Sequence, residues 1–163
     1  MPLTKDQHDH YIDILNNTKR LTAAGGYPPE IQAFASRADR EILTLEAAGH
    51  SFPCYLNRAH TVQPGAPLFI NIHGGGLLIG NKEFNRYFCA KLCLLGYVVF
   101  SVEYRLIPDC TVYDQFSDVS TAMTFIRDNL SSYQGNPDKI YGVADSGGAY
   151  LLTNVAAMTK NKK

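Results

Sequence analysis

One stretch of the chain constrains its fold more than any other: an apolar run at 66–73, APLFINIH, passes directly into three glycines. A near-continuous apolar run of this length is typical of a parallel strand that is covered on both faces. From residue 41 onward, strand-like segments alternate with segments of helical periodicity, which implies right-handed crossovers. The sequence therefore predicts an α/β fold: a three-layer α/β/α sandwich around a mostly parallel, doubly wound sheet.

The other expected elements follow from the same patterns. Apolar residues recur at helical spacing in the first forty residues, with Thr4 as a possible N-cap and two prolines opening a second short helix. We divide the chain into N-terminal helices at 1–40 and a core at 41–163. In the core we expect a hairpin of strands 41–47 and 51–57, strands at 66–73, 97–104 and 139–144, and helices at 84–95, 116–130 and after Ser146.

Composition excludes several classes of function. The 15 basic and 15 acidic side chains balance and no basic run alternates with aromatics, so we expect no nucleic-acid partner. The polar start and the lack of a long apolar run predict no membrane span and a cytoplasmic protein. Without paired C-x-x-C spacing, we interpret the cysteines as reduced thiols: Cys54, Cys89, Cys93 and Cys110. Cys89 and Cys93 fit the core of a helix better than a metal pair, and we expect no metal and no cofactor.

Two glycine-rich loops carry the chemistry. Because ligands bind beyond the carboxyl ends of the strands in an open α/β sheet, the loops after 66–73 and 139–144 share one rim. The second loop, GVADSGGAYL, places Ser146 between a strand and a helix, with Ala144 and Gly148 two positions to either side. Small neighbours are needed in the sharp turn of a nucleophile elbow, which pushes the serine hydroxyl outward.

Backbone amides from both loops can serve one oxygen atom. The helix after Ser146 directs unpaired N–H groups and the positive end of its dipole toward charge beside the serine. The glycines after His73 have no Cβ, so their amides can reach the same oxygen, and each such donor contributes roughly 3 kcal/mol to a transition state. Together the loops predict an oxyanion site around a serine nucleophile.

Three motifs, in this order along the chain, resemble the hormone-sensitive-lipase-like carboxylesterases of the α/β-hydrolase family. They are HGGG at 73–76, SVEYRLIPD at 101–109 and ADSGGA at 144–149. The resemblance runs from about Arg40 to Met158. It implies a truncated α/β-hydrolase fold, the N-terminal portion of the family, that ends after the nucleophile elbow.

The resemblance also implies a function. Ser146 would be the nucleophile of a serine esterase, lipase-like, that cleaves short-chain acyl esters through an acyl-enzyme. The amides of Gly75, Gly76 and Gly147 would form the oxyanion hole. The helices at 1–40 would form a cap over the acyl pocket.

The chain departs from the family in two places. Ala144 stands where the family usually has glycine, which adds one methyl group at a crowded point. No acid and no histidine follow Ser146, although the triad order in this fold is serine, acid, histidine. Since a serine hydroxyl is a weak nucleophile without a base, we expect the chain alone to be weak or inactive.

Nearby charged groups are interpreted as structural. The motif places none of four histidines as the base: His8, His10, His50 and His60. His73 heads the glycine loop, where the resemblance implies that it orients the backbone, and it implies that Asp145 points away from the serine. We expect Glu103 and Arg105 to form a buried charged pair that supports the loops.

Strand 139–144 is expected to form an edge, because the family's sheet continues with strands that this chain lacks. Its unpaired backbone groups predict a partner, either a complementing C-terminal segment or a second copy in a homo-oligomer. A non-catalytic relic that binds a ligand or a protein is the alternative function. A nucleotide-binding domain is disfavoured, since neither loop fits G-x-G-x-x-G or a P-loop.

Overall fold

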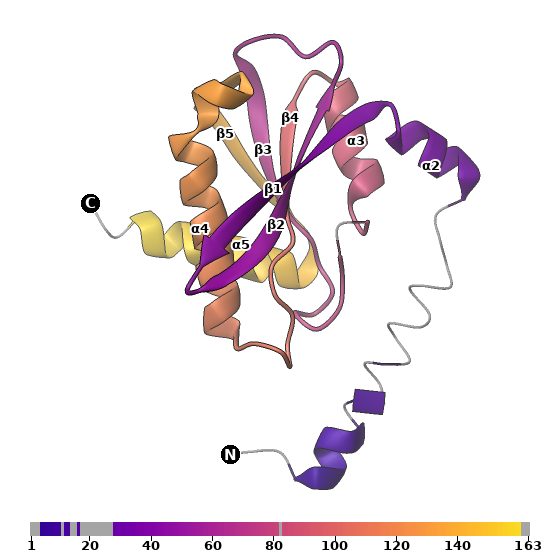
Figure 1. Ribbon diagram of the computed structural model, residues 1–163, viewed down its shortest axis with the longest axis vertical. Helices are drawn as coiled ribbons and strands as arrows, with labels where there is room; N and C mark the ends of the chain where they lie inside the picture. The colour runs from indigo at the N-terminus through magenta and orange to yellow at the C-terminus, as the bar shows by residue number, and fades with distance from the viewer. Residues whose placement is uncertain (1–3, 11, 14–15, 17–27, 82, 161–163) are drawn as a thin grey trace.

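The structure is a computed structural model that describes residues 4–10, 12–13, 16, 28–81 and 83–160 (Figure 1). Five strands form one sheet: β1 (Ala38–Ala47), β2 (His50–Ala59), β3 (Ala66–Ile72), β4 (Val98–Val102) and β5 (Gly135–Ala144). The helices are α2 (Pro29–Ala35), α3 (Arg86–Leu94), α4 (Val112–Asp128), the 3-10 helix η1 (Leu130–Tyr133) and α5 (Ser146–Lys160).

The strands lie in the order β1-β2-β4-β3-β5, and the sheet is mixed. β1 and β2 form an antiparallel hairpin across Ala48 and Gly49, whose φ angles of 50° and 77° suit a two-residue turn. β2 is antiparallel to β4, whereas β3 runs parallel to both β4 and β5. The carboxyl ends of β3, β4 and β5 therefore meet at one rim, where Ile72 pairs with Val102 and with Ala144.

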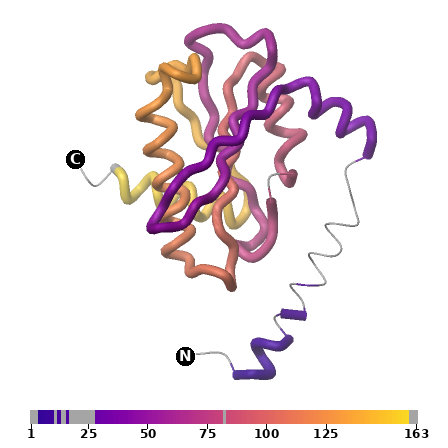
Figure 2. The backbone as a smooth tube through the Cα atoms, in the orientation of Figure 1, coloured from indigo at the N-terminus to yellow at the C-terminus, as the bar shows by residue number. Residues whose placement is uncertain are grey.

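Buried residues pack on both faces of the sheet. Val98 and Phe100 of β4 lie in the larger cluster with apolar residues of α4 and α5. The intervening Val99 packs in a smaller cluster with Cys89 and Cys93 of α3. Because alternate residues of a strand face opposite sides, α4 and α5 cover one face and α3 covers the other. Figure 2 traces the chain from β3 through α3 to β4 and then through α4 to β5, which confirms the three-layer α/β sandwich.

Three elements begin three or four residues earlier than the sequence predicted, whereas the other core elements begin within two residues of the expected positions. β1 begins at Ala38, inside the range assigned to the N-terminal helices. α4 begins at Val112 rather than 116, because Thr111 and Asp114 form a capping box that starts the helix earlier. β5 begins at Gly135 rather than 139, since the turn-forming residues pair with β3 across a register shift.

β5 pairs with β3 alone and forms an edge of the sheet among the described strands, as expected. It includes Pro137, which has no N–H and limits further pairing at its start. Much of the predicted helical region 1–27 lies outside the described residues, but Thr4 does cap a helical turn through Gln7. None of the described helices combines the length and hydrophobicity that a membrane crossing requires.

Candidate active site

Ser146 lies in the sharp turn between β5 and α5. Its φ of 47° is left-handed, which a non-glycine residue rarely adopts, and the residue is exposed. α5 begins at this serine; the amides of Gly148 and Ala149 donate to the carbonyl oxygen of Asp145 at 2.9 and 3.3 Å, whereas that of Gly147 has no acceptor among the described residues. Ala144, one of the two departures from the family pattern, packs against the larger core cluster, which accommodates its methyl group.

Two glycines bring the start of α5 against the end of β3. A Cβ on Gly148 would lie 2.3 Å from the carbonyl oxygen of Ile72 and 2.4 Å from that of His73, so no side chain fits there. A Cβ on Gly147 would lie 3.2 Å from the amide nitrogen of Gly76. The serine turn and the glycine loop therefore touch, as the sequence analysis predicted.

The glycine loop, residues 73–80, is closed by hydrogen bonds to its carbonyl oxygens. The carbonyl of Gly75 accepts from two amides of its own turn, at 3.0 and 3.1 Å. The carbonyl of Leu77 accepts from the amide of Ile107 at 3.0 Å and from Nε2 of Gln115 at 2.9 Å. These contacts leave the loop little freedom.

Four backbone amides where the two loops meet have no acceptor in the part of the chain that the structure describes. Within the described residues, the amides of Gly75, Gly76, Leu77 and Gly147 donate to no protein acceptor, whereas that of Gly74 donates to Asp145. Of the three amides that the sequence predicted, the structure places that of Gly76 against Gly147, and Gly75 is its neighbour in the chain. Such unpaired donors at a helix start suit an anionic oxygen.

His73 is buried, with 1% of its surface exposed, and its Nδ1 faces the carbonyl oxygen of Gly74 at 2.8 Å. Its ring stacks on Tyr104 with centroids 4.4 Å apart, and the Tyr104 hydroxyl donates to the His73 carbonyl at 2.8 Å. Burial lowers the pKa of His73, which favours the neutral ring. The ring therefore orients the loop backbone and does not contact Ser146 through a hydrogen bond.

Asp145 also holds the glycine loop. Its Oδ1 accepts from the Gly74 amide at 3.1 Å and from Nδ2 of Asn85 at 2.9 Å. Asn85 donates in turn to Asn71 at 3.1 Å, and Asn71 donates to Ser101 at 3.1 Å. Neither asparagine could be predicted as part of the site, because no local pattern links Asn85 to Asn71, 14 positions away, or to Asp145, 60 positions away.

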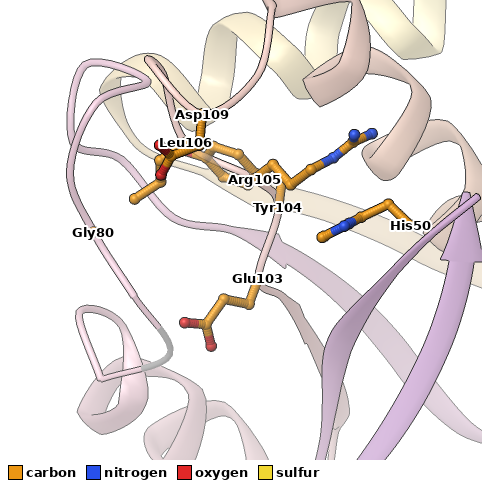
Figure 3. Close-up of a pocket in the computed structure, with 7 residues that line it drawn as sticks. All are labelled: His50, Gly80, Glu103, Tyr104, Arg105, Leu106 and Asp109. Atoms are coloured by element: carbon orange, nitrogen blue, oxygen red, sulfur yellow. The ribbon is translucent and has the colours of Figure 1, made fainter. Parts of the chain in front are cut away.

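No described histidine completes a triad. His50 and Glu103 line a cleft of about 390 Å³. Figure 3 shows both side chains. His8 and His60 contact aspartates on the surface. Among the hydrogen bonds of the described residues, none joins a histidine to Ser146.

Arg105 pairs with Asp118, and the expected pair of Arg105 with Glu103 is wrong. Its Nε and Nη2 donate to Asp118 at 2.9 and 2.7 Å, and Asp118 is fully buried. These bonds raise the pKa of Arg105. Glu103 instead interacts with the hydroxyl of Tyr55, whose pKa burial and Glu103 together raise to about 12. Figure 3 shows the reason: the side chains of Arg105 and Glu103 point in different directions.

The cysteines are free thiols. Cys54, Cys89 and Cys93 are buried, and burial raises the pKa of each to about 12, whereas Cys110 is half-buried. Cys89 and Cys93 lie in the smaller core cluster. Across the described ranges, no three His, Cys, Asp or Glu side chains lie together as a metal site would require.

The mixed sheet, with a glycine loop and a serine turn meeting at the ends of β3 and β5, defines an α/β-hydrolase. The BD-FAE family model matches residues 54–163, and the chain belongs to this family. The match covers all three motifs and both loops of the candidate site.

Relatives and solved structures agree with this assignment. The chain is 29% identical to the probable isoprenylcysteine alpha-carbonyl methylesterase ICMEL1 of Oryza sativa subsp. japonica over 118 residues, 72% of this chain and 27% of the relative. It is 33% identical to esterase LipQ of Mycobacterium tuberculosis over 107 residues, 64% of this chain and 25% of the relative. The structure of EstE1, a thermostable carboxylesterase from a metagenomic library, superposes with a TM-score of 0.75 at 25% identity, covering 94% of this chain and 50% of EstE1. The chain therefore spans about a quarter of these relatives and half of EstE1.

Proposed function

We propose that the chain carries the nucleophile of a serine carboxylesterase and cleaves short-chain acyl esters through an acyl-enzyme on Ser146. The supporting observation is that the two loops meet. Ser146 is exposed and has a φ of 47°, and the nitrogen of Gly76 lies 3.2 Å from the point that a Cβ on Gly147 would occupy. The names of the relatives above, esterase and methylesterase, fit this class of reaction.

In the proposed reaction, Oγ of Ser146 attacks the ester carbonyl carbon while a base takes its proton. The carbonyl oxygen becomes an oxyanion held by the amides of Gly75, Gly76 and Gly147. Collapse of this intermediate breaks the C–O bond, and the alcohol leaves with the proton. Water then hydrolyses the acyl-enzyme by the same route, releasing the acid and restoring the serine. Each amide donor contributes a factor of roughly 10²–10³ in rate.

We propose that the base and its acid come from a segment outside these 163 residues, because no described histidine is hydrogen-bonded to Ser146. The edge strand β5 offers such a segment a place to pair, since its only neighbour in the described sheet is β3 and Tyr141 is 48% exposed. A second copy of the chain pairing at this edge is the alternative. The N-terminal helices, at 1–40 in the sequence-based division, are proposed to cover the acyl pocket.

A fluorophosphonate probe tests the nucleophile, since it phosphonylates an activated serine hydroxyl. We expect one probe per chain on Ser146 by peptide mass spectrometry, and none in the Ser146→Ala variant. Loss of the base lowers rates by about 10⁴-fold, so added imidazole, which can accept the proton, should accelerate labelling. A folded chain that stays unlabelled even with imidazole would contradict the proposal and favour a non-catalytic binding module.

A further inference from the structure

Gln115 is a fully buried polar residue that the proposed reaction does not use directly. It lies near the start of α4 with 0% of its surface exposed. Its Nε2 donates to the carbonyl oxygen of Leu77 at 2.9 Å and to that of Arg105 at 2.8 Å. Because a buried amide is costly unless it is hydrogen-bonded, these two bonds offset the cost for Nε2, whereas Oε1 is buried without a partner among the described residues. One side chain therefore joins the glycine loop to the segment after β4.

Leu77 is the residue at which Gln115 holds the glycine loop. Its φ of 69° is left-handed, and a non-glycine residue keeps such a conformation only where its surroundings impose it. Its amide nitrogen lies 3.1 Å from the Cβ position of Gly147, against the serine turn. The contacts that fix the Leu77 carbonyl therefore also fix the part of the loop that meets the serine turn.

A second buried side chain of α4 anchors the same segment. Asp118 lies three residues after Gln115, on the same face of the helix. It accepts from the backbone amide of Arg105 at 3.0 Å, while Gln115 donates to the backbone carbonyl of that residue. Arg105 is thus held on both sides, and α4 forms a rigid support from which Gln115 reaches Leu77.

We propose that Gln115 is a positioning residue of the oxyanion hole: its carboxamide holds the carbonyl of Leu77 in place, so that the amides of Gly75 and Gly76 stay directed at the oxygen of the bound ester. This role rests on the proposed function. Gln115 acts through the loop and does not touch the substrate. It needs an amide, because Nε2 supplies both donors.

Three variants test this role through fluorophosphonate labelling in the presence of imidazole. Gln115→Met keeps the shape without the donors, and Val119→Ala disturbs the same buried face of α4 without removing a hydrogen bond to the loop. We expect Gln115→Met to lower the maximal labelling rate about 10- to 100-fold, as misplacement near a reacting centre does, with the half-saturating probe concentration unchanged. Val119→Ala should label like the wild type.

The third variant, Gln115→Glu, adds a pH signature, which is read only where circular dichroism shows the variant folded at both pH values, because an ionised buried carboxylate also destabilises a fold. A carboxyl facing two carbonyl oxygens has a raised pKa and donates a hydrogen bond only while protonated. Compared with the wild type at the same pH, Gln115→Glu should label more efficiently at pH 5 than at pH 8. If Gln115→Met fails to fold, the comparison of Gln115→Glu at the two pH values still tests the positioning role of Gln115.

A second measurement separates this proposal from the proposed function. In ¹⁵N-glycine NMR spectra, the amide signals of Gly75 and Gly76 should shift and broaden in Gln115→Met but not in Val119→Ala. An unlabelled wild type would refute the proposed function, and the glycine signals would still test the positioning. The positioning role would be overturned if folded Gln115→Met labelled at the wild-type rate with unchanged glycine signals. It would also be overturned if Val119→Ala lost as much labelling as Gln115→Met.

Discussion

Replacing Arg105 by methionine leaves the carboxylate of Asp118 buried without its charged partner. Asp118 has 0% of its surface exposed, and it loses the two side-chain hydrogen bonds at 2.7 and 2.9 Å. The bond from the backbone amide, at 3.0 Å, remains. Since breaking a buried ion pair costs about 3–5 kcal/mol, we expect the free energy of unfolding to fall by that amount. This is a large share of the roughly 5–15 kcal/mol that stabilises a typical domain.

Urea denaturation followed by circular dichroism measures this change, provided that the slope of the transition is the same in both proteins. Glu103→Gln is the matched control, because Glu103 is the partner that sequence proximity suggested. Its side chain keeps an acceptor for Tyr55, so we expect a loss below about 1 kcal/mol. The double variant Arg105→Met with Asp118→Leu should recover much of the stability, because it removes the uncompensated charge. Equal losses in Arg105→Met and Glu103→Gln would refute the pairing.

Two further predictions concern packing. Gly148→Ala should lower the free energy of unfolding, measured in urea, by about 1–3 kcal/mol or more, because its Cβ would lie 2.3 Å from the carbonyl oxygen of Ile72. The control Gly76→Ala has open space at its Cβ and should cost only the roughly 1–2 kcal/mol of a left-handed backbone. A larger loss in Gly76→Ala than in Gly148→Ala would contradict this geometry. In the native protein, Ellman's reagent should modify Cys110 alone, because the other three thiols are buried with pKa values of about 12. All four thiols should react in urea. Fast reaction of a second thiol without urea would count against the described core.

Much of the core could be predicted from periodicity. The apolar run of β3 and the helical spacing in α3 are local patterns, and both elements lie where they were expected within a few residues. The start of α4 was missed because a capping box, not apolar spacing, defines it. The partner of Arg105 was predicted wrongly, since proximity in sequence says little about where a long side chain turns once a strand has ended.

For this chain, the sequence alone determined the α/β class, the family resemblance and the two loops that meet at the site. These depend on features that act locally: repeat length, glycines without a Cβ, and a serine between small residues. Only the tertiary structure decided which side chains hold those loops. Gln115 reaches Leu77 across 38 positions and Asp145 reaches Gly74 across 71, contacts that exist because parallel strands and their crossovers bring distant segments to one rim.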